Sequence, residues 1–328
     1  MTSRLTHHRL PLGWAVRCAV WLVLAIAMPL TAQAAEVDTG ARDCKTRAGS
    51  TLSHFWELST ANDCDTFRLR GYKPVSVMGV FSDGVNKQPL STAANRSATT
   101  SQDYQRHEGL LQLSIRTKLA TGLLPADPGR TDGLWFGYTQ KSFWQVFSRG
   151  LSRPFRTTDH EPELAYIYPV EAAVGMGFTA RYAGLSLNHQ SNGQAAPYSR
   201  SWNRVILMAG ADRADGSQLN VRIWKRMSEN PSSDDNPDIA NYIGRAEVSA
   251  LWPVNPKNSL GLSVRHNLRR EGHGSGTVDW YIRPGVTLSN PNAGLRYHLQ
   301  LFSGHGDSLA SYNFKRTSLR FGVSLVDW

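Results

Sequence analysis

Short segments in which apolar and polar residues alternate recur along the chain from Tyr72 to the C-terminus. In residues 111–116, leucine and isoleucine occupy every second position, and polar residues fill the positions between them. The same period of two residues returns in four later segments: 219–223, 260–265, 278–283 and 318–325. Because successive side chains of a β-strand point to opposite faces, the pattern predicts strands with one apolar and one polar face.

Twelve strands of this kind are expected between residue 72 and the C-terminus. Their centres lie near residues 77, 114, 140, 165, 184, 207, 222, 248, 264, 281, 299 and 323. A soluble sandwich also alternates, but its apolar faces need a second sheet to cover them. Here the strands are long and the polar face often carries arginine, which favours a barrel with an apolar outside and a polar lumen. We therefore predict an all-β fold, a 12-stranded antiparallel transmembrane β-barrel over residues 72–328.

The lengths of the connections predict which end of the barrel faces outwards. Short connections are expected at three places, after the sixth, eighth and tenth strands: 213–217, 255–257 and 289–293. Longer connections follow the odd-numbered strands. Bacterial barrels have short periplasmic turns and long outer loops. The connection between the fifth and sixth strands, which includes residues 194–200, is therefore expected to lie near the outer leaflet.

Residues 1–34 have the features of a cleaved signal peptide. Three arginines precede the apolar run 18–30, and Ala-Gln-Ala at 32–34 supplies the small residues of a signal peptidase site. The run is shorter than the ~20 residues that a transmembrane helix needs. The alternative, a retained membrane anchor, lacks a stop-transfer pattern after the apolar run.

Residues 35–71 are polar and weakly patterned, and we interpret them as an N-terminal extension of the barrel. Cys18 would leave with the signal peptide, so Cys44 and Cys64 remain in the exported chain. Two cysteines in an exported protein predict one Cys44–Cys64 disulfide, worth roughly 3 kcal/mol for a loop of this length. Two free thiols are the alternative.

The formal net charge of the chain is +10 at pH 7. The lysines and arginines are scattered and form no block of the kind that marks a nucleic-acid interface. We therefore expect no nucleic-acid partner, and expect the positive charges to face water or acidic lipid head groups.

Three polar residues near the middle of the chain interrupt the apolar faces of two predicted strands. His189 and Ser191 share the face of the fifth strand that carries Leu185 and Leu187, and Asn203 shares the apolar face of the sixth strand. Antiparallel pairing across one loop would bring the three polar residues together. A serine becomes a nucleophile when a neighbouring imidazole takes its proton, and an amide oxygen can fix the orientation of that imidazole. No Gly-x-Ser-x-Gly motif supports a nucleophile-elbow hydrolase.

The residues around these positions form motifs that resemble those of the bacterial outer membrane phospholipase A family. The motifs are Asn188-His189-Gln190-Ser191-Asn192-Gly193, Ser199-Arg200-Ser201-Trp202-Asn203-Arg204, Tyr138-Thr139-Gln140-Lys141-Ser142, Ser152-Arg153-Pro154-Phe155-Arg156, Asp235-Asn236-Pro237-Asp238 and Ser311-Tyr312-Asn313-Phe314. The resemblance implies a twelve-stranded barrel, a Ser-His-Asn triad, dependence on Ca²⁺ and activation by homodimerisation. It assigns Ser191 as the nucleophile, His189 as the general base and Asn203 as the residue that orients it. Gly193 would contribute its N–H to the oxyanion site.

The resemblance also implies calcium ligands and a dimer contact. The positions that match the family's ligands are Ser152, Gln194 and Ser199, whose oxygen atoms suit a hard cation. The chain departs from the family at Gln194, where arginine is common, and at Arg153, where the family has a second serine. Gln140 matches a polar residue that the family places at the dimer interface.

Two functions are compatible with these features. The first is a calcium-dependent phospholipase of the bacterial outer membrane, active as a homodimer, that hydrolyses acyl esters of phospholipids and lysophospholipids. The alternative is a passive barrel, a porin or transport pore, in which the polar residues only pack or gate. A further cluster, Asp159, His160 and Glu161, is interpreted as charge on an outer loop and not as a metal site.

Overall fold

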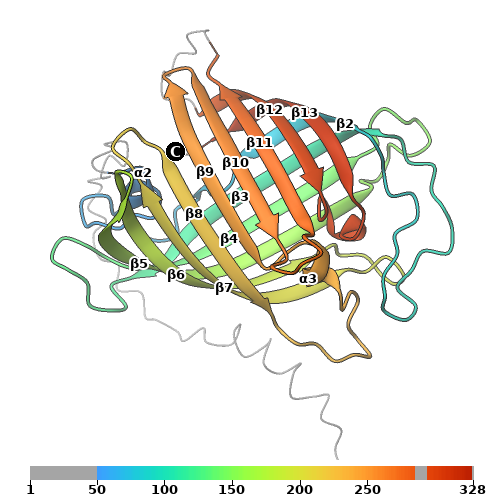
Figure 1. Cartoon of the computed structure of the whole chain (residues 1–328), viewed down its shortest axis with the longest axis horizontal. Helices are drawn as coiled ribbons and strands as arrows, with labels where there is room; N and C mark the ends of the chain where they lie inside the picture. The colour runs from blue at the N-terminus through green and yellow to red at the C-terminus, as the bar shows by residue number, and fades with distance from the viewer. Residues whose placement is uncertain (1–49, 285–293, 327–328) are drawn as a thin grey trace, which may run out of the picture. The chain divides into compact units, whose positions relative to one another are not determined.

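A computed structural model describes residues 50–284 and 294–326 of the chain (Figure 1). The chain divides into two units, Met1–Asp43 and Cys44–Trp328. The predicted signal peptide, Cys44 and the predicted turn at 289–293 lie outside the described residues. Cleavage of the signal peptide and the Cys44–Cys64 disulfide therefore stay predictions.

Twelve long strands of the described residues form one closed antiparallel sheet (Figure 1). They are β2 (Val75–Ser82), β3 (His107–Thr121), β4 (Gly133–Trp144), β5 (Thr157–Gly175), β6 (Phe178–Ser191), β7 (Ser201–Asp212), β8 (Gln218–Arg226), β9 (Ala246–Asn255), β10 (Asn258–His266), β11 (Gly274–Ile282), β12 (Leu295–Gly304) and β13 (Arg316–Leu325). Each strand pairs with the next along the chain, and β13 pairs with β2 to close the barrel. A short thirteenth strand, β1 (Arg70–Gly71), pairs with β3. The predicted twelve-stranded barrel is confirmed, and closure gives each of the twelve long strands a hydrogen-bonded neighbour on both sides.

The alternation read from the sequence separates the two faces of the barrel wall. On β6, Leu185 and Leu187 are exposed on the outer face, whereas Ser186 and Asn188 between them are buried on the inner face. The same arrangement holds on β13, where Phe321 is exposed and Arg320 is buried. Apolar side chains therefore cover the outside of the barrel and polar side chains fill the inside.

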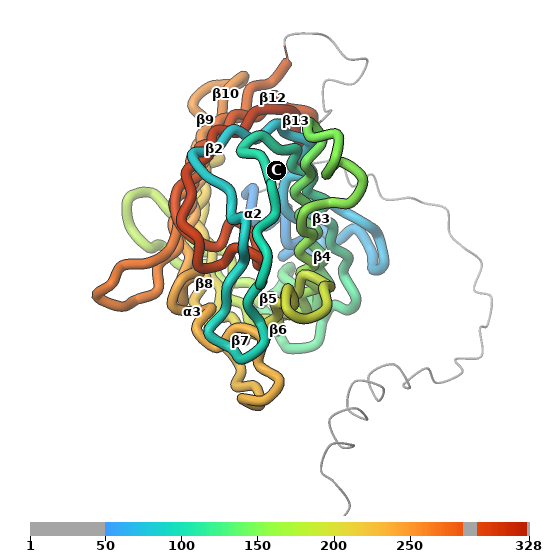
Figure 2. The backbone as a smooth tube through the Cα atoms, turned by 90° about the vertical axis from the view of Figure 1, so that its right-hand side faces the viewer, coloured from blue at the N-terminus to red at the C-terminus, as the bar shows by residue number. Residues whose placement is uncertain are grey.

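The connections differ between the two ends of the barrel. At one end, called here the long-connection end, five of the six links are long: residues 83–106, 145–156, 192–200, 227–245 and 305–315. The fourth of these includes helix α3 (Ile239–Tyr242), and the fifth includes the 3-10 helix η1 (Leu309–Ser311). Figure 2 looks at this end, across which the link between β2 and β3 runs. No helix within residues 50–284 and 294–326 is long and apolar enough to cross a membrane.

The opposite end, called here the short-turn end, has tight links such as Met176-Gly177 and is covered by the N-terminal segment. Helix α2 (Thr51–Phe55) begins after Ser50, whose hydroxyl caps it by accepting from the Ser53 N–H. Leu52 and Trp56 are buried among inward side chains of the barrel. The Leu52 N–H also donates to the Asp212 carboxylate at 2.9 Å, at the end of β7.

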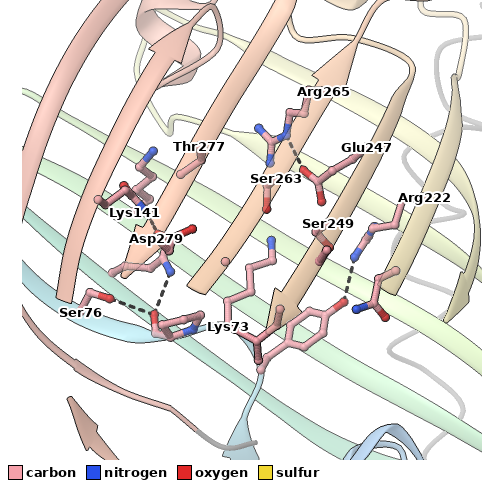
Figure 3. A pocket seen from close by; sticks show the side chains of 18 of the residues that line it. Lys73, Ser76, Lys141, Arg222, Glu247, Ser249, Ser263, Arg265, Thr277 and Asp279 are labelled. Carbon is pink, nitrogen blue, oxygen red and sulfur yellow. Dashed lines mark hydrogen bonds and ion pairs between the residues drawn. The ribbon is translucent and has the colours of Figure 1, made fainter. Parts of the chain in front are cut away.

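The lumen is filled mainly by paired charges. Arg222 lies 2.7 Å from Glu163, and Arg265 lies 2.6 Å from Glu247. Figure 3 shows the second pair beside a cavity of about 410 Å³ that opens between the inward faces of the strands. A buried charge is costly unless an opposite charge and hydrogen bonds compensate it. Arg222 and Arg265 are therefore each compensated by a carboxylate on the inner face.

Candidate active site

His189 and Asn203 meet on the outer face of the barrel near the long-connection end. They are directly opposite each other in the register of β6 and β7. The Nδ1 atom of His189 lies 2.8 Å from Oδ1 of Asn203. An amide oxygen only accepts, so Nδ1 carries the hydrogen, and Nε2 of the same ring is left with its lone pair. The imidazole is thus oriented as a base with Nε2 as the basic atom.

Ser191 is the last residue of β6 and follows His189 by two positions, on the same face. In the neighbouring strands it is opposite His160 on β5 and Ser201 on β7. Side chains directly opposite in an antiparallel pair have Cβ atoms roughly 4.5–5.5 Å apart. Ser191 therefore has an imidazole two positions before it on its own strand, and another beside it on β5.

The chain turns sharply just after Ser191. Gly193 has a φ of +63°, a backbone conformation that glycine adopts without the steric cost of a Cβ atom. The buried Asn192 side chain closes the loop by donating to the Tyr198 carbonyl at 2.8 Å and accepting from the Arg200 N–H at 2.9 Å. Burial lowers the pKa of the Arg200 guanidinium from its ordinary value. The loop between β6 and β7 is therefore held by its own polar residues.

The motif at the start of β7 serves both faces of the strand. Ser201 and Asn203 point outwards, whereas Trp202 and Arg204 are buried on the inner face. The Trp202 indole N–H donates to Oε1 of Gln190 at 2.9 Å, and the Arg204 guanidinium lies 4.2 Å from the Trp202 ring centroid. These inward contacts fix the register that places Asn203 opposite His189.

Gln194 and Ser199 lie in the loop between β6 and β7, and Ser152 lies in the link between β4 and β5. The Ser199 hydroxyl donates to the Asp235 carboxylate at 2.5 Å, so its oxygen is held in place. The Ser152 carbonyl accepts from the Trp144 indole at 2.7 Å. Within the described ranges, no group of three histidine, cysteine or acidic side chains is arranged to hold a metal. The three positions offer hydroxyl, amide and carbonyl oxygens, and the Asp235 carboxylate lies beside Ser199; all are ligands that calcium accepts.

Gln140 lies on the outer face of β4, directly opposite His160 of β5. Since His160 is in turn opposite Ser191, the three side chains form one row across β4, β5 and β6. The hydroxyl of Tyr138, two positions before Gln140, lies 2.7 Å from Nδ1 of His160. The sequence alone connected Gln140 with dimerisation and missed this link with Ser191.

The interpretation of Asp159, His160 and Glu161 as outer-loop charge is wrong, because all three lie within β5. Asp159 faces inwards, where its carboxylate accepts from the Leu309 N–H at 2.8 Å. Glu161 also faces inwards and lies 3.0 Å from Arg204. Only His160 points to the outer face. The observed link between β4 and β5 ends at residue 156, so the strand already includes the three residues.

Known proteins of one family are similar to this chain in sequence. A sequence model of the phospholipase A1 family matches residues 52–325. Phospholipase A1 of Salmonella typhimurium is 30% identical over 311 residues, which cover 93% of this chain and 97% of the relative.

Two solved structures are similar over most of the barrel. A crystal structure of the Salmonella typhi outer membrane phospholipase dimer with bound calcium has a TM-score of 0.68 at 29% identity, and the match covers 81% of this chain and 94% of that chain. An active-site mutant of outer membrane phospholipase A from Escherichia coli, with an asparagine replaced by alanine, has a TM-score of 0.67 at 28% identity and the same coverage. The chain therefore belongs to the phospholipase A1 family, the family of the bacterial outer membrane phospholipases A.

Proposed function

We propose that the protein is a calcium-dependent phospholipase of the bacterial outer membrane that hydrolyses acyl ester bonds of phospholipids and lysophospholipids. The observation that carries the proposal is the 2.8 Å hydrogen bond between His189 and Asn203, beside Ser191 on the outer face. An oriented imidazole next to a serine is the arrangement that makes a hydroxyl nucleophilic. The family of the chain and the active-site asparagine of the Escherichia coli relative support it.

In the first half of the reaction, Oγ of Ser191 attacks the ester carbonyl carbon while Nε2 of His189 takes the hydroxyl proton. Asn203 holds the imidazolium through its amide oxygen. The N–H of Gly193 donates to the oxyanion of the tetrahedral intermediate. When the intermediate collapses, the bond to the glycerol oxygen breaks, and His189 gives its proton to that oxygen.

In the second half, water replaces the departed lysophospholipid. His189 takes a proton from the water molecule while the water oxygen attacks the carbonyl carbon of the acyl group on Ser191. The acyl-oxygen bond to Ser191 then breaks, the fatty acid leaves, and the serine recovers its proton from His189. The two halves return the enzyme to its starting state.

The position of the triad fits a substrate that approaches from the bilayer. Leu185 and Leu187 precede His189 on the same exposed face of β6. A phospholipid in the outer leaflet could place its acyl chains along these leucines and its ester at Ser191 without leaving the membrane. The long-connection end then faces outwards, as long loops do in bacterial barrels.

We assign Gln194, Ser199 and Ser152 as the residues that hold calcium. Oxygen donors and the hydroxyl of Ser199, fixed by Asp235, support this assignment. When bound by these residues, calcium would polarise the ester carbonyl. The calcium-bound dimer of the Salmonella typhi relative supports a homodimeric active form, with Gln140 at the contact between the two copies.

The alternative function, a passive pore, has less support. Paired charges occupy the lumen, and helix α2 with Trp56 packs into the short-turn end. Neither the polar pair on the outer face nor its hydrogen bond would have a role in a pore. Ion conductance in planar bilayers without lipid turnover would favour the pore.

The test is phospholipid hydrolysis by the purified protein in mixed micelles, with calcium and with excess chelator. Ser191→Ala should lower kcat by at least about 10⁴-fold. The matched control is Ser201→Ala, because Ser201 lies opposite Ser191 on the same face, and it should retain kcat within about threefold. Equal activity of wild type and Ser191→Ala would refute the proposal, and activity unchanged by chelator would refute the calcium requirement.

A further inference from the structure

His160 is a second imidazole beside the nucleophile, and the mechanism above gives it no role. It lies on the outer face of β5, directly opposite Ser191 in the β5–β6 register. The His160 side chain is half-buried, and on β5 it lies between Gln140 of β4 and Ser191 of β6. A side chain in this position borders any ester bound at Ser191.

The ring of His160 is held from one side. The Tyr138 hydroxyl lies 2.7 Å from Nδ1 of His160 and 3.3 Å from Oε1 of Gln140, and the two rings stack with centroids 6.2 Å apart. The hydroxyl has one hydrogen: Oε1 of Gln140 can only accept it, whereas the contact with His160 can run in either direction. In the tautomer in which Nδ1 accepts from Tyr138, the hydrogen of the neutral imidazole is on Nε2. This tautomer uses the 2.7 Å contact with His160 and gives up the 3.3 Å contact with Gln140.

The free side of this ring faces the turn after the nucleophile. A Cβ atom placed on Gly193 would lie 3.7 Å from Cδ2 and 3.8 Å from Nε2 of His160. Gly193 therefore leaves open the space beside Nε2. The N–H of the same glycine is the proposed donor to the oxyanion, so Nε2 of His160 borders the place where negative charge develops.

Resting on the proposed phospholipase function, we infer that His160 is a further catalytic residue, whose Nε2–H donates a hydrogen bond to the substrate oxyanion. It acts with the Gly193 N–H, while His189 alone exchanges the proton with Ser191. Tyr138 is a positioning residue that fixes the donor tautomer of His160.

The two imidazoles thus have opposite polarity. Asn203 accepts from Nδ1 of His189, which leaves Nε2 as a base. In the proposed tautomer of His160, Tyr138 donates to Nδ1, and Nε2 is a donor. A donor aimed at the oxyanion stabilises charge that exists only in the transition state and its intermediate. Its loss should therefore lower kcat and leave KM almost unchanged.

The experiment measures kcat and KM for phospholipid hydrolysis in four proteins: wild type, His160→Phe, Tyr138→Phe and the double variant. We expect His160→Phe to lower kcat roughly 10- to 100-fold, somewhat less than the loss of an oxyanion donor in an enclosed site. Tyr138→Phe should lower kcat several-fold in wild type and should have no further effect in the His160→Phe background. This non-additivity separates positioning from general damage to the fold. The β-sheet content of each variant, measured by circular dichroism, serves as the folding control.

Several results would overturn the inference. An unchanged kcat for a folded His160→Phe variant would show that Nε2 contacts no reacting atom. A loss as complete as that of Ser191→Ala would make His160 the base. Additive effects of Tyr138→Phe and His160→Phe would remove the link between the two. A wild-type rate no higher than that of Ser191→Ala would overturn the phospholipase function together with the inference, whereas the other results leave that function standing.

Discussion

Polar side chains occur on both faces of this barrel, but those of the lumen differ in kind from those beside Ser191. In the lumen they are mostly full charges in pairs, such as Arg222 with Glu163. On the outer face, His189 and Asn203 beside Ser191 form one hydrogen bond and no ion pair. A charge in an apolar environment needs an opposite charge, whereas a neutral imidazole needs only one partner.

The difference indicates two separate roles for polar residues in one sheet. The lumen charges satisfy each other, so their removal should cost stability. On the outer face, Nε2 of His189 and the hydroxyl of Ser191 have no hydrogen-bond partner among residues 50–284 and 294–326, so both atoms can interact with a substrate. Substitutions on the two faces should therefore have distinct signatures, loss of stability on one and loss of turnover on the other.

The largest loss of stability is expected from a buried lumen lysine. Lys118 is 1% exposed and lies 2.7 Å from Glu57 and 2.6 Å from Asp63, both in the N-terminal segment. Lys118→Ala should lower the free energy of unfolding by about 3 kcal/mol, because it leaves the buried Glu57 carboxylate and the partly exposed Asp63 carboxylate without this partner. Denaturant unfolding in lipid vesicles measures the change. The exposed lysine variant Lys257→Ala is the control, and an equal stability for the two would contradict the role assigned to the lumen charges.

The orienting residue of the outer face should affect turnover. Asn203→Ala should lower kcat roughly 100-fold with little change in unfolding, since the imidazole of His189 loses its only partner on Nδ1 among the described residues. The matched variant is Asn188→Ala, on the inner face, where Asn188 donates to Glu161 and Glu163. It should lower stability and keep kcat within about threefold. The same signature for both variants would break the distinction between the two faces.

The smallest effect is expected at the proposed dimer contact. Gln140→Ala should weaken the proposed homodimer by about 1 kcal/mol, because it removes one polar contact from the interface. Sedimentation in detergent with calcium measures the dissociation constant. Gln112→Ala serves as the control, since Gln112 faces inwards and donates to the Pro74 carbonyl. Equal dissociation constants for wild type and Gln140→Ala would place Gln140 outside the contact.

The fold could be predicted largely from alternation. The alternation within a strand predicts which side chains face outwards, as the exposed Leu185 and Leu187 show. The predicted connection 213–217 coincides with the observed link between β7 and β8. The N-terminal segment could not be predicted this way. Trp56 and its neighbours show no period of two residues, and their burial depends on a lumen that exists only once the barrel has closed.

The candidate site could be predicted only in part, for a related reason. His189 and Ser191 are close in sequence, and one loop brings Asn203 to them. The row that adds His160 depends on the register between β5 and β6, which is set by pairing and not by the pattern of either strand. Its position beside acidic neighbours suggested a loop, although Asp159 and Glu161 point into the lumen.

The central claim is that Ser191 on the outer face is the nucleophile, and covalent labelling tests it most directly. A long-chain alkylsulfonyl fluoride traps an activated serine, as Oγ bonds to sulfur, fluoride leaves and the proton passes to the base. Mass spectrometry of the labelled wild type should find the sulfonyl group on Ser191, and His189→Ala should prevent labelling. Labelling at another residue, or undiminished labelling of Ser191→Ala, would contradict the account.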